Sequence, residues 1–180
     1  KIVAITYATT DSENGELKRH ISRIGNEDEC LILAEFVEVL NILSKDESKK
    51  QFPILCGHNI IGHDIPLLIK RLLIYRDRPE IGKKIPAILK NSLNIKPWES
   101  GILDTANVWK FNGYDNMPLM MIADYLGFKK TIDLLPHNKL SEYYWKNIKV
   151  NPTETMKYIQ LQSATQVNLV IKLLDELRQL

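Results

Sequence analysis

The chain has 180 residues, a length that favours one domain and is enough for a substantial core. Hydrophobic residues make up 44% and charged residues 26%, as is ordinary for a soluble globular protein, and no apolar run reaches the roughly 18 residues of a membrane span. The net charge of +2 conceals an asymmetry between an acidic first part and a basic segment further along the chain.

The first part of the chain predicts a hairpin and a helix. Ile2–Ala8 is rich in β-branched residues, and Leu17–Ile24 follows the turn-like string "DSENG", so we expect these two strands to pair. Asn26 and Glu29 have the spacing of a helix-capping pair. An apolar period typical of a helix follows as far as Leu43.

The middle of the chain predicts two more strands and a helix between them. Ile54–Cys56 is short and apolar, as a buried strand would be. A helix is expected to start near Asp64, with a proline in its first turn, where proline is tolerated. A short helix is expected at Ile85–Leu89, and Ile102–Val108 is expected to be a further strand.

The last part of the chain predicts only helices. Two short ones are expected at Pro118–Leu126 and Ser141–Lys146, and a long one begins at Asn151 and runs to about Arg178. The order of strands and helices predicts one mixed α/β domain over residues 1–180, with the four strands in one sheet and helices on both sides.

The segment behind the helix at Asp64 carries eight basic residues against the acidic Asp77 and Glu80. Such a segment is either a solvated face or a strip that meets phosphate groups, which would gain affinity through counterion release. Both interpretations stay open from the sequence. The basic residues are Lys70, Arg71, Arg76, Arg78, Lys83, Lys84, Lys90 and Lys96.

The two cysteines, Cys30 and Cys56, do not have the spacing of a metal site. We interpret them as two buried thiols in a reducing compartment, which makes the cytoplasm the expected location of the protein.

Three polar fragments are candidates for a functional site. They are the loop Asn59–Asp64, Asp104, and a stripe of the last helix that includes Tyr158 and Gln162. Each also has a structural explanation. Asp64 would be a helix N-cap, Asp104 would bond a loop at a strand end, and the stripe would be a solvent-facing side of its helix.

Taken in order, the fragments resemble the motifs of DEDD-type 3'–5' exonucleases, in particular the predicted exonucleases related to the proofreading domain of family B DNA polymerases. "GHNIIGHDIPLLIKR" resembles the second motif, where an Asn and an aromatic-Asp pair precede a helix. Asp104-Thr105, the pairs Leu126-Gly127 and Tyr144-Trp145, and Tyr158 at the Tyr position of the third motif extend the resemblance over nearly the whole chain. It implies an RNase H-like mixed sheet flanked by helices.

The resemblance also implies the chemistry. Members of this group use two Mg²⁺ or Mn²⁺ ions, held by carboxylates, to hydrolyse phosphodiester bonds, here expected at single-stranded DNA 3' ends. Asp64 would be a metal ligand and Tyr158 would orient the attacking water, with Gln162 at the position of the last carboxylate; all three would face one cleft. The residues expected to contact nucleic acid are Asn59, His63, Lys70 and Arg71.

Two departures from the family pattern affect this expectation. The Asp-x-Glu motif of the opening strand is absent, and the nearest similar string, Asp11–Glu13, falls in a predicted turn. Because that strand is central in the family, we expect an upstream segment before Lys1 or a strand from another chain to supply it; without it the sheet would divide. Gln162 replaces the last Asp and brings no charge to a metal, so hydrolysis should be weak and Gln162→Asp should strengthen it.

Three hypotheses therefore stay open. The first is a metal-dependent 3'–5' exonuclease acting on DNA. The second is an exonuclease-like module that binds nucleic acid or a protein partner without cutting. The third is an unrelated α/β domain whose motifs agree by chance. An upstream Asp-x-Glu would favour the first over the second, and the sequence does not indicate the oligomeric state.

Overall fold

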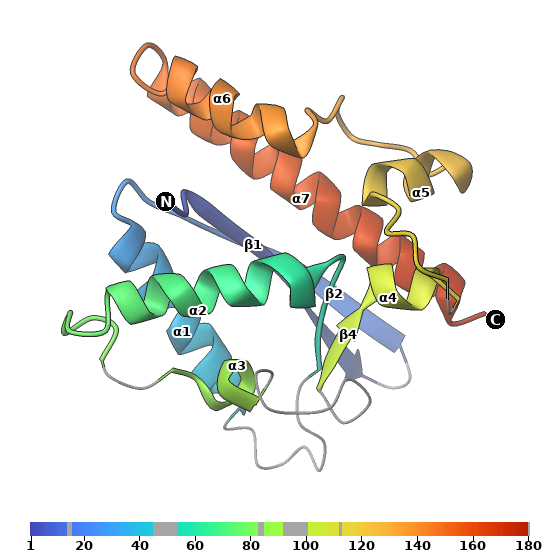
Figure 1. Cartoon of the computed structure of the whole chain (residues 1–180), viewed down its shortest axis with the longest axis horizontal. Helices are drawn as coiled ribbons and strands as arrows, with labels where there is room; N and C mark the ends of the chain where they lie inside the picture. Colours follow the sequence, from blue (N-terminus) through green and yellow to red (C-terminus); the bar gives the residue numbers. More distant parts are fainter. Residues whose placement is uncertain (14–15, 45–53, 83–84, 92–100, 112, 180) are drawn as a thin grey trace. The chain divides into compact units, whose positions relative to one another are not determined.

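The computed structural model divides into two compact units, and both combine strands with helices, so the chain is of the α/β class (Figure 1). Unit 1 joins Lys1–Glu27 to Ala123–Leu180, and unit 2 is Asp28–Ile122. The expectation of a single domain over residues 1–180 stays a prediction. The described residues are 1–13, 16–44, 54–82, 85–91, 101–111 and 113–179.

The hairpin of unit 1 confirms the first predicted pairing. β1 (Ala4–Glu13) and β2 (Glu16–Gly25) are antiparallel, with Ile5 opposite Ile24. Both strands are longer than expected because the pairing continues towards the turn. The backbone of Asp11–Glu13, predicted to lie in a turn, therefore forms the end of β1.

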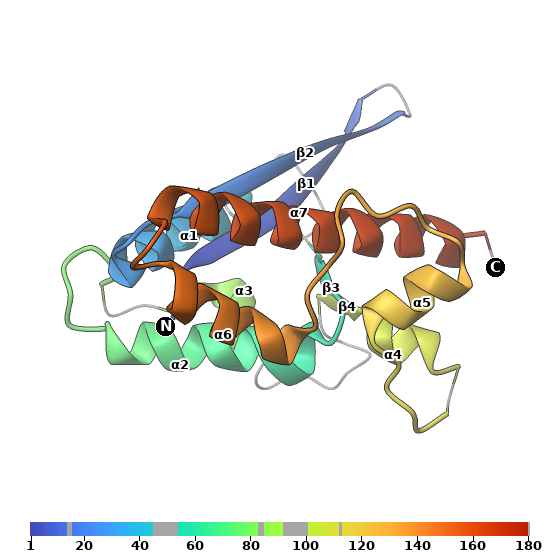
Figure 2. The same cartoon turned by 90° about the horizontal axis from the view of Figure 1, so that it is seen from above.

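One long helix, α7 (Pro152–Leu177), packs against this hairpin and against α6 (His137–Asn147), as Figures 1 and 2 show from two directions. It starts as predicted, because the side chain of Asn151 accepts a hydrogen bond from the Glu154 N–H at 3.3 Å and a proline follows at the first helical position. Burial of its apolar stripe stabilises the unit. Buried apolar side chains of unit 1 include Ile24, Leu134, Tyr144, Ile159, Ala164, Leu169 and Leu173.

Polar contacts also fasten the hairpin to α7. The hydroxyl groups of Thr6 and Ser163 are 2.6 Å apart. Further along, Arg19 of β2 forms an ion pair with Asp175, and its Nη1 lies 2.8 Å from Oδ2 of that carboxylate. These contacts join residues more than 150 positions apart in the sequence, which fixes how the two ends of unit 1 meet.

In unit 2, the start of α1 (Glu29–Ser44) involves a side chain that the sequence analysis did not name. The carboxylate of Asp28 accepts a hydrogen bond from the Cys30 N–H at 2.8 Å, as a helix-capping side chain does. The side chain of Glu29 binds Arg71. The helix is confirmed, and the capping pair of Asn26 and Glu29 stays a prediction.

Unit 2 also contains a short parallel pair of strands, β3 (Leu55–Gly57) and β4 (Ile102–Asp104). β4 is shorter than the predicted strand Ile102–Val108, because Asp104 caps a helix and so ends the extended chain. The other elements are η1 (Ile60–Asp64), α2 (Ile65–Ile74), α3 (Ala87–Asn91), α4 (Thr105–Trp109) and α5 (Leu119–Tyr125), the last of which contains the boundary to unit 1.

The prediction of one four-stranded sheet is wrong for the described residues, whose strands form two separate two-stranded sheets. β1 and β2 are neighbours in the sequence and pair with each other, whereas β3 and β4, which pair in parallel, are more than forty residues apart. No described strand connects the two pairs. Among the described helices, none combines the length and apolar character that a bilayer span requires.

The two thiols differ in environment. Burial raises the pKa of the Cys30 thiol above its ordinary value, and the nearby carboxylates of Glu80 and Asp28 raise it further, against the opposing cation of Arg78. Since the folded chain holds this proton more tightly than the unfolded chain, the associated stability is lost as pH rises past the ordinary cysteine pKa. Cys56 is only half-buried.

Thiol titration checks this difference. With a thiol-specific aromatic disulfide at pH 8, we expect one fast phase from Cys56 and a second that appears only on unfolding, because a buried thiol is poorly ionised and inaccessible. Cys56→Ser should remove the fast phase. Two equally fast phases in the native chain would contradict the burial of Cys30.

Candidate functional site

The loop that enters α2 has an unusual backbone. Asn59 is left-handed, with φ 60° and ψ 27°, and Ile60–Asp64 form a single π-helical turn in which the Ile65 N–H donates to the Ile60 carbonyl. The His63 N–H donates to the Asn59 carbonyl at 3.0 Å. π-Helical turns are rare and occur frequently at functional sites.

The sequence "NIIGHD" suits this turn locally. Asparagine tolerates the left-handed region better than most residues. At Gly62 a Cβ would lie 2.5 Å from Oδ1 of Asn59, so a larger residue there would displace that side chain. The sequence signal for the turn is therefore the asparagine at its left-handed position.

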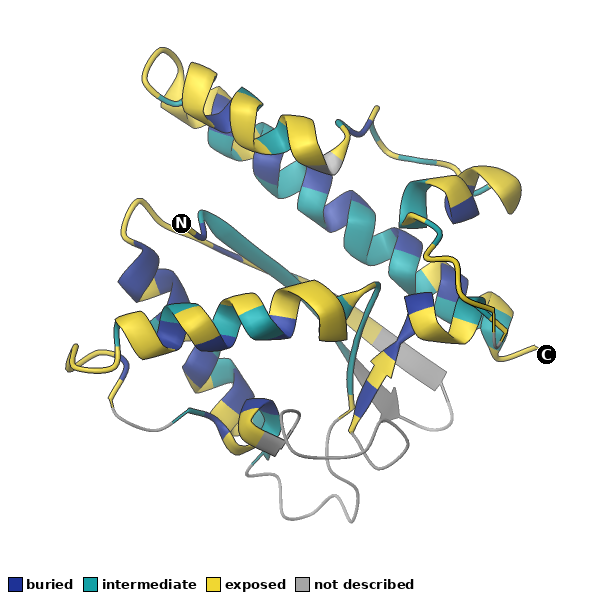
Figure 3. Ribbon diagram, viewed as in Figure 1, coloured by how far each residue is buried: buried dark blue, intermediate teal, exposed yellow. Residues whose placement is uncertain are grey.

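Asp64 lies at the exposed end of this turn. Its side chain is 54% exposed, and Oδ1 is 3.1 Å from Nδ1 of His63, whose side chain is 47% exposed. Although it precedes α2, Asp64 makes no side-chain capping bond there with any described residue. The N-cap explanation therefore does not account for Asp64. Figure 3 shows the turn that precedes α2 in the exposed colour.

Asp104 has the opposite character. It is 5% exposed and accepts backbone hydrogen bonds from Ala106 at 3.0 Å, Asn59 at 2.8 Å and Ile61 at 3.1 Å. The first of these bonds caps α4, and the other two hold the loop. The structural explanation considered for Asp104, a loop contact at a strand end, is therefore what the structure contains.

The residues next to this contact reinforce the β3–β4 pair. The hydroxyl of Thr105 donates to the Gly57 carbonyl at 3.2 Å and lies 3.1 Å from Nδ1 of His58. Nε2 of the same imidazole is 2.9 Å from the carbonyl oxygen of Met117. Gly57 and His58, which precede the loop, are thus held by Thr105 and by the Met117 carbonyl.

Gln162 is buried in unit 1, with no exposed surface. Its Oε1 accepts from the Leu135 N–H at 3.2 Å, and its Nε2 donates to the Leu135 carbonyl at 2.9 Å. Both ends of the amide therefore bind the main chain of one residue in the connection that leads into α6. This pairing gives Gln162 a structural function in unit 1.

Tyr158, one turn earlier on α7, contacts the same connection. Its hydroxyl donates to the Asp133 carbonyl at 3.2 Å, and its ring centroid is 4.7 Å from that of Tyr143 on α6. Burial raises the pKa of the Tyr158 hydroxyl, with smaller contributions from Tyr143 and the Asp133 carboxylate. Two residues of the polar stripe of α7, Tyr158 and Gln162, therefore bind the connection that leads into α6. The stripe is not only a solvent-facing side of the helix.

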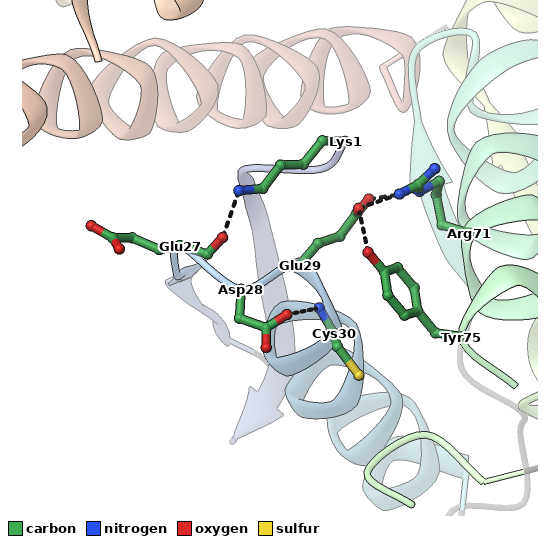
Figure 4. Close-up of polar contacts among 7 residues, drawn as sticks. All are labelled: Lys1, Glu27, Asp28, Glu29, Cys30, Arg71 and Tyr75. Atoms are coloured by element: carbon green, nitrogen blue, oxygen red, sulfur yellow. Dashed lines mark hydrogen bonds and ion pairs between the residues drawn. The ribbon is translucent and has the colours of Figure 1, made fainter. Parts of the chain in front are cut away.

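Arg71 also forms a structural contact, an ion pair with Glu29 that Figure 4 shows. Its Nε donates to Oε1 of Glu29 at 2.7 Å and its Nη2 binds Oε2, while the Tyr75 hydroxyl donates to Oε2 at 3.2 Å. Glu29 is 2% exposed. The hydrogen bond to Glu29 raises the pKa of Arg71. The neighbouring Lys70 is exposed.

The structure thus groups part of the predicted site. Asn59, His63 and Asp64 lie on one loop, and Lys70 lies on the helix that follows. Tyr158 and Gln162 belong to unit 1, so their convergence with Asp64 stays a prediction. Of the basic segment, Lys70, Arg76, Arg78 and Lys90 are exposed, whereas Lys83, Lys84 and Lys96 lie outside the described residues.

Comparisons with protein-family models, with curated proteins and with solved structures found no match for this chain. Within the described part of the chain, no three His, Cys, Asp or Glu side chains form a group that would hold a metal ion. Asp104 uses both oxygens on backbone amides, and the Gln162 oxygen binds Leu135. These donors do not fit the two-metal site that the resemblance implies.

Proposed function

We propose that this chain is an RNase H-like, exonuclease-type domain that binds single-stranded nucleic acid, chiefly DNA 3' ends, through the loop Asn59–Asp64 and the start of α2. The observation that carries the proposal is the π-helical turn behind a left-handed Asn59, which leaves His63 and Asp64 exposed. A sparsely populated backbone conformation persists only where its surroundings enforce it, and such residues cluster at functional sites.

The side chains around this turn suit a nucleotide chemically. The Asn59 amide offers a donor and an acceptor, and the exposed His63 ring can stack on a base. Ile61 and Leu67 add exposed apolar surface, and Lys70 adds a cation for a phosphate group. A short segment of chain therefore combines hydrogen bonding, stacking and charge.

The structural contacts of the other motif residues support binding of nucleic acid without efficient hydrolysis. Gln162 is buried and paired with Leu135, and Asp104 holds the loop. Without further carboxylates, Asp64 alone supplies too little charge to hold two divalent ions. The chemistry proposed for the described residues is therefore recognition of the strand rather than hydrolysis.

A second candidate function is metal-dependent 3'–5' hydrolysis with Mg²⁺ or Mn²⁺. One observation favours it: the Asp64 carboxylate is exposed and makes no capping bond to a described residue, so it is available to a cation. The two candidates differ in how a divalent ion acts. A metal would be attracted by Asp64, whereas a bare Asp64 would repel a phosphate.

Fluorescence anisotropy with a 5'-labelled single-stranded DNA of twelve nucleotides tests the proposal. In EDTA we expect salt-dependent binding, with Lys70→Ala reducing the slope of log Kd against log salt by about 0.7. Asp64→Asn should tighten metal-free binding by about two- to fivefold, because it removes a like charge worth up to about 1 kcal/mol at a surface. Lys149→Ala, an exposed lysine of unit 1, is the control.

The other outcomes are distinct. Mn²⁺ that tightens binding by the wild type but not by Asp64→Asn, together with EDTA-sensitive shortening of the DNA, would establish the hydrolase instead. Equal affinity for DNA with a 3'-phosphate would contradict recognition of the 3' end. No binding to the oligonucleotide at low salt would overturn the proposed function and leave a protein partner as the hypothesis.

A further inference from the structure

The carboxylate of Asp104 joins two parts of unit 2 that are more than forty residues apart in the sequence. Its Oδ1 accepts from the N–H groups of Ala106 and Asn59, and its Oδ2 accepts from the Ile61 N–H. One of these donors starts α4, and the other two lie in the loop that presents Asp64. The side chain is 5% exposed, so water competes little for these bonds.

The two loop donors flank the unusual part of the backbone. Asn59 is left-handed, and Ile61 lies inside the π-helical turn. In this conformation both N–H groups point at one carboxylate, and a loop in which either turned away would lose its bond to Asp104 in a site with little water. The bonds to Asp104 therefore select the conformation in which His63 and Asp64 face outward, in addition to supporting the loop.

We propose that Asp104 is a positioning residue, which sets the conformation of the Asn59–Asp64 loop and through it the placement of Asp64. The inference rests on the proposed function for the loop and deepens it. It assigns Asp104 no contact with nucleic acid or metal. Both bonds join the Asp104 carboxylate to backbone N–H groups of the loop, so the effect of Asp104 on binding is transmitted by the shape of the loop.

Three converging donors explain why an aspartate is needed at this position. A carboxylate is an acceptor on both oxygens, whereas an asparagine offers one acceptor and turns an N–H₂ group towards a backbone donor. Asp104→Asn should therefore lose the contact to Ile61 or the contacts to Asn59 and Ala106. Asp104→Ser keeps an oxygen that can cap α4 but is too short to reach the loop.

Amide hydrogen exchange followed by NMR tests the contact directly. In Asp104→Asn and in Asp104→Ser, the Asn59 and Ile61 amides should exchange about ten- to a hundredfold faster, while those of Ile69 and Leu72 inside α2 stay unchanged. Uniform acceleration would indicate loss of stability only and would overturn the proposal. The control is Asp115→Asn, which makes the same chemical change at an exposed position of unit 2.

A double-mutant cycle in the DNA-binding assay tests positioning. If Asp104 acts through the loop, the two- to fivefold effect of Asp64→Asn should shrink to less than about 1.5-fold in the Asp104→Asn background. A merely structural residue would leave that effect unchanged, and this result would overturn the proposal. Failure of the wild type to bind DNA would instead refute the proposed function, because the exchange rates report on the Asp104 contact without any ligand.

Discussion

Replacing Gln162 with aspartate should lower the free energy of unfolding by about 2 to 4 kcal/mol rather than restore a metal ligand. The aspartate side chain is one methylene shorter and cannot pair with both the N–H and the carbonyl of Leu135, which now lie 3.2 and 2.9 Å from the amide. It would also bring an ionisable group to a position without exposed surface. Urea denaturation followed by circular dichroism measures the loss.

The matched control is Gln166→Asp. It makes the same change one turn later on α7, at a half-buried position, and so reports the cost of aspartate in the helix alone, well under about 1 kcal/mol. A Gln162→Asp chain that is as stable as the control would show that the Leu135 pairing contributes little. A stable Gln162→Asp chain that gains Mn²⁺-dependent trimming of DNA ends would restore the sequence-based expectation of a weakened hydrolase.

The motif predicts that Gln162→Asp strengthens a metal site, whereas the contacts of Gln162 predict a loss of stability. Gln162 stands at the position where the family has an aspartate, so the sequence indicated that a metal ligand had been lost. The partner that gives the glutamine its function, Leu135, is 27 residues away in an irregular connection. No periodicity in the sequence reports such a contact, so the structural function of Gln162 could not be predicted.

Elements governed by local rules were predictable. The start of α7 follows from Asn151 and the proline behind it, and the start of α2 follows from a proline in its first turn. The β1–β2 pairing follows from the β-branched residues of the first strand and the turn-like string "DSENG". In each case the deciding interactions are within a few residues, where sequence patterns are informative.

Elements governed by distant contacts were not predictable. The strand expected at Ile102–Val108 ends early because Asp104 bonds Ala106 and the loop at Asn59, and the single sheet does not form among the described strands. Within the candidate site, the motif identified Asn59, His63 and Asp64. It could not show that the loop is held by Asp104, which the sequence placed inside a strand, because the bonds to Asn59 and Ile61 span 45 and 43 positions.

Arg71 provides the second large effect. Arg71→Met should lower the free energy of unfolding by about 3 kcal/mol, because it leaves the carboxylate of Glu29, which is 2% exposed, without its ionic partner. The Tyr75 hydroxyl, 3.2 Å from that carboxylate, carries no charge that could replace the guanidinium of Arg71. Lys70→Met, at the exposed neighbouring position, should change stability by less than about 0.5 kcal/mol. Urea denaturation at pH 7 gives both values.

A double substitution separates charge from packing. Adding Glu29→Gln to Arg71→Met removes the stranded charge, so the double variant should recover at least about 1 kcal/mol relative to Arg71→Met alone. Because Glu29 already holds Nε and Nη2 of Arg71, the DNA affinity of the folded double variant should match that of the wild type, whereas Lys70→Met should weaken it. Additive losses would show that the pair is not coupled, and a weaker DNA complex would return Arg71 to the substrate-binding role expected from the motif.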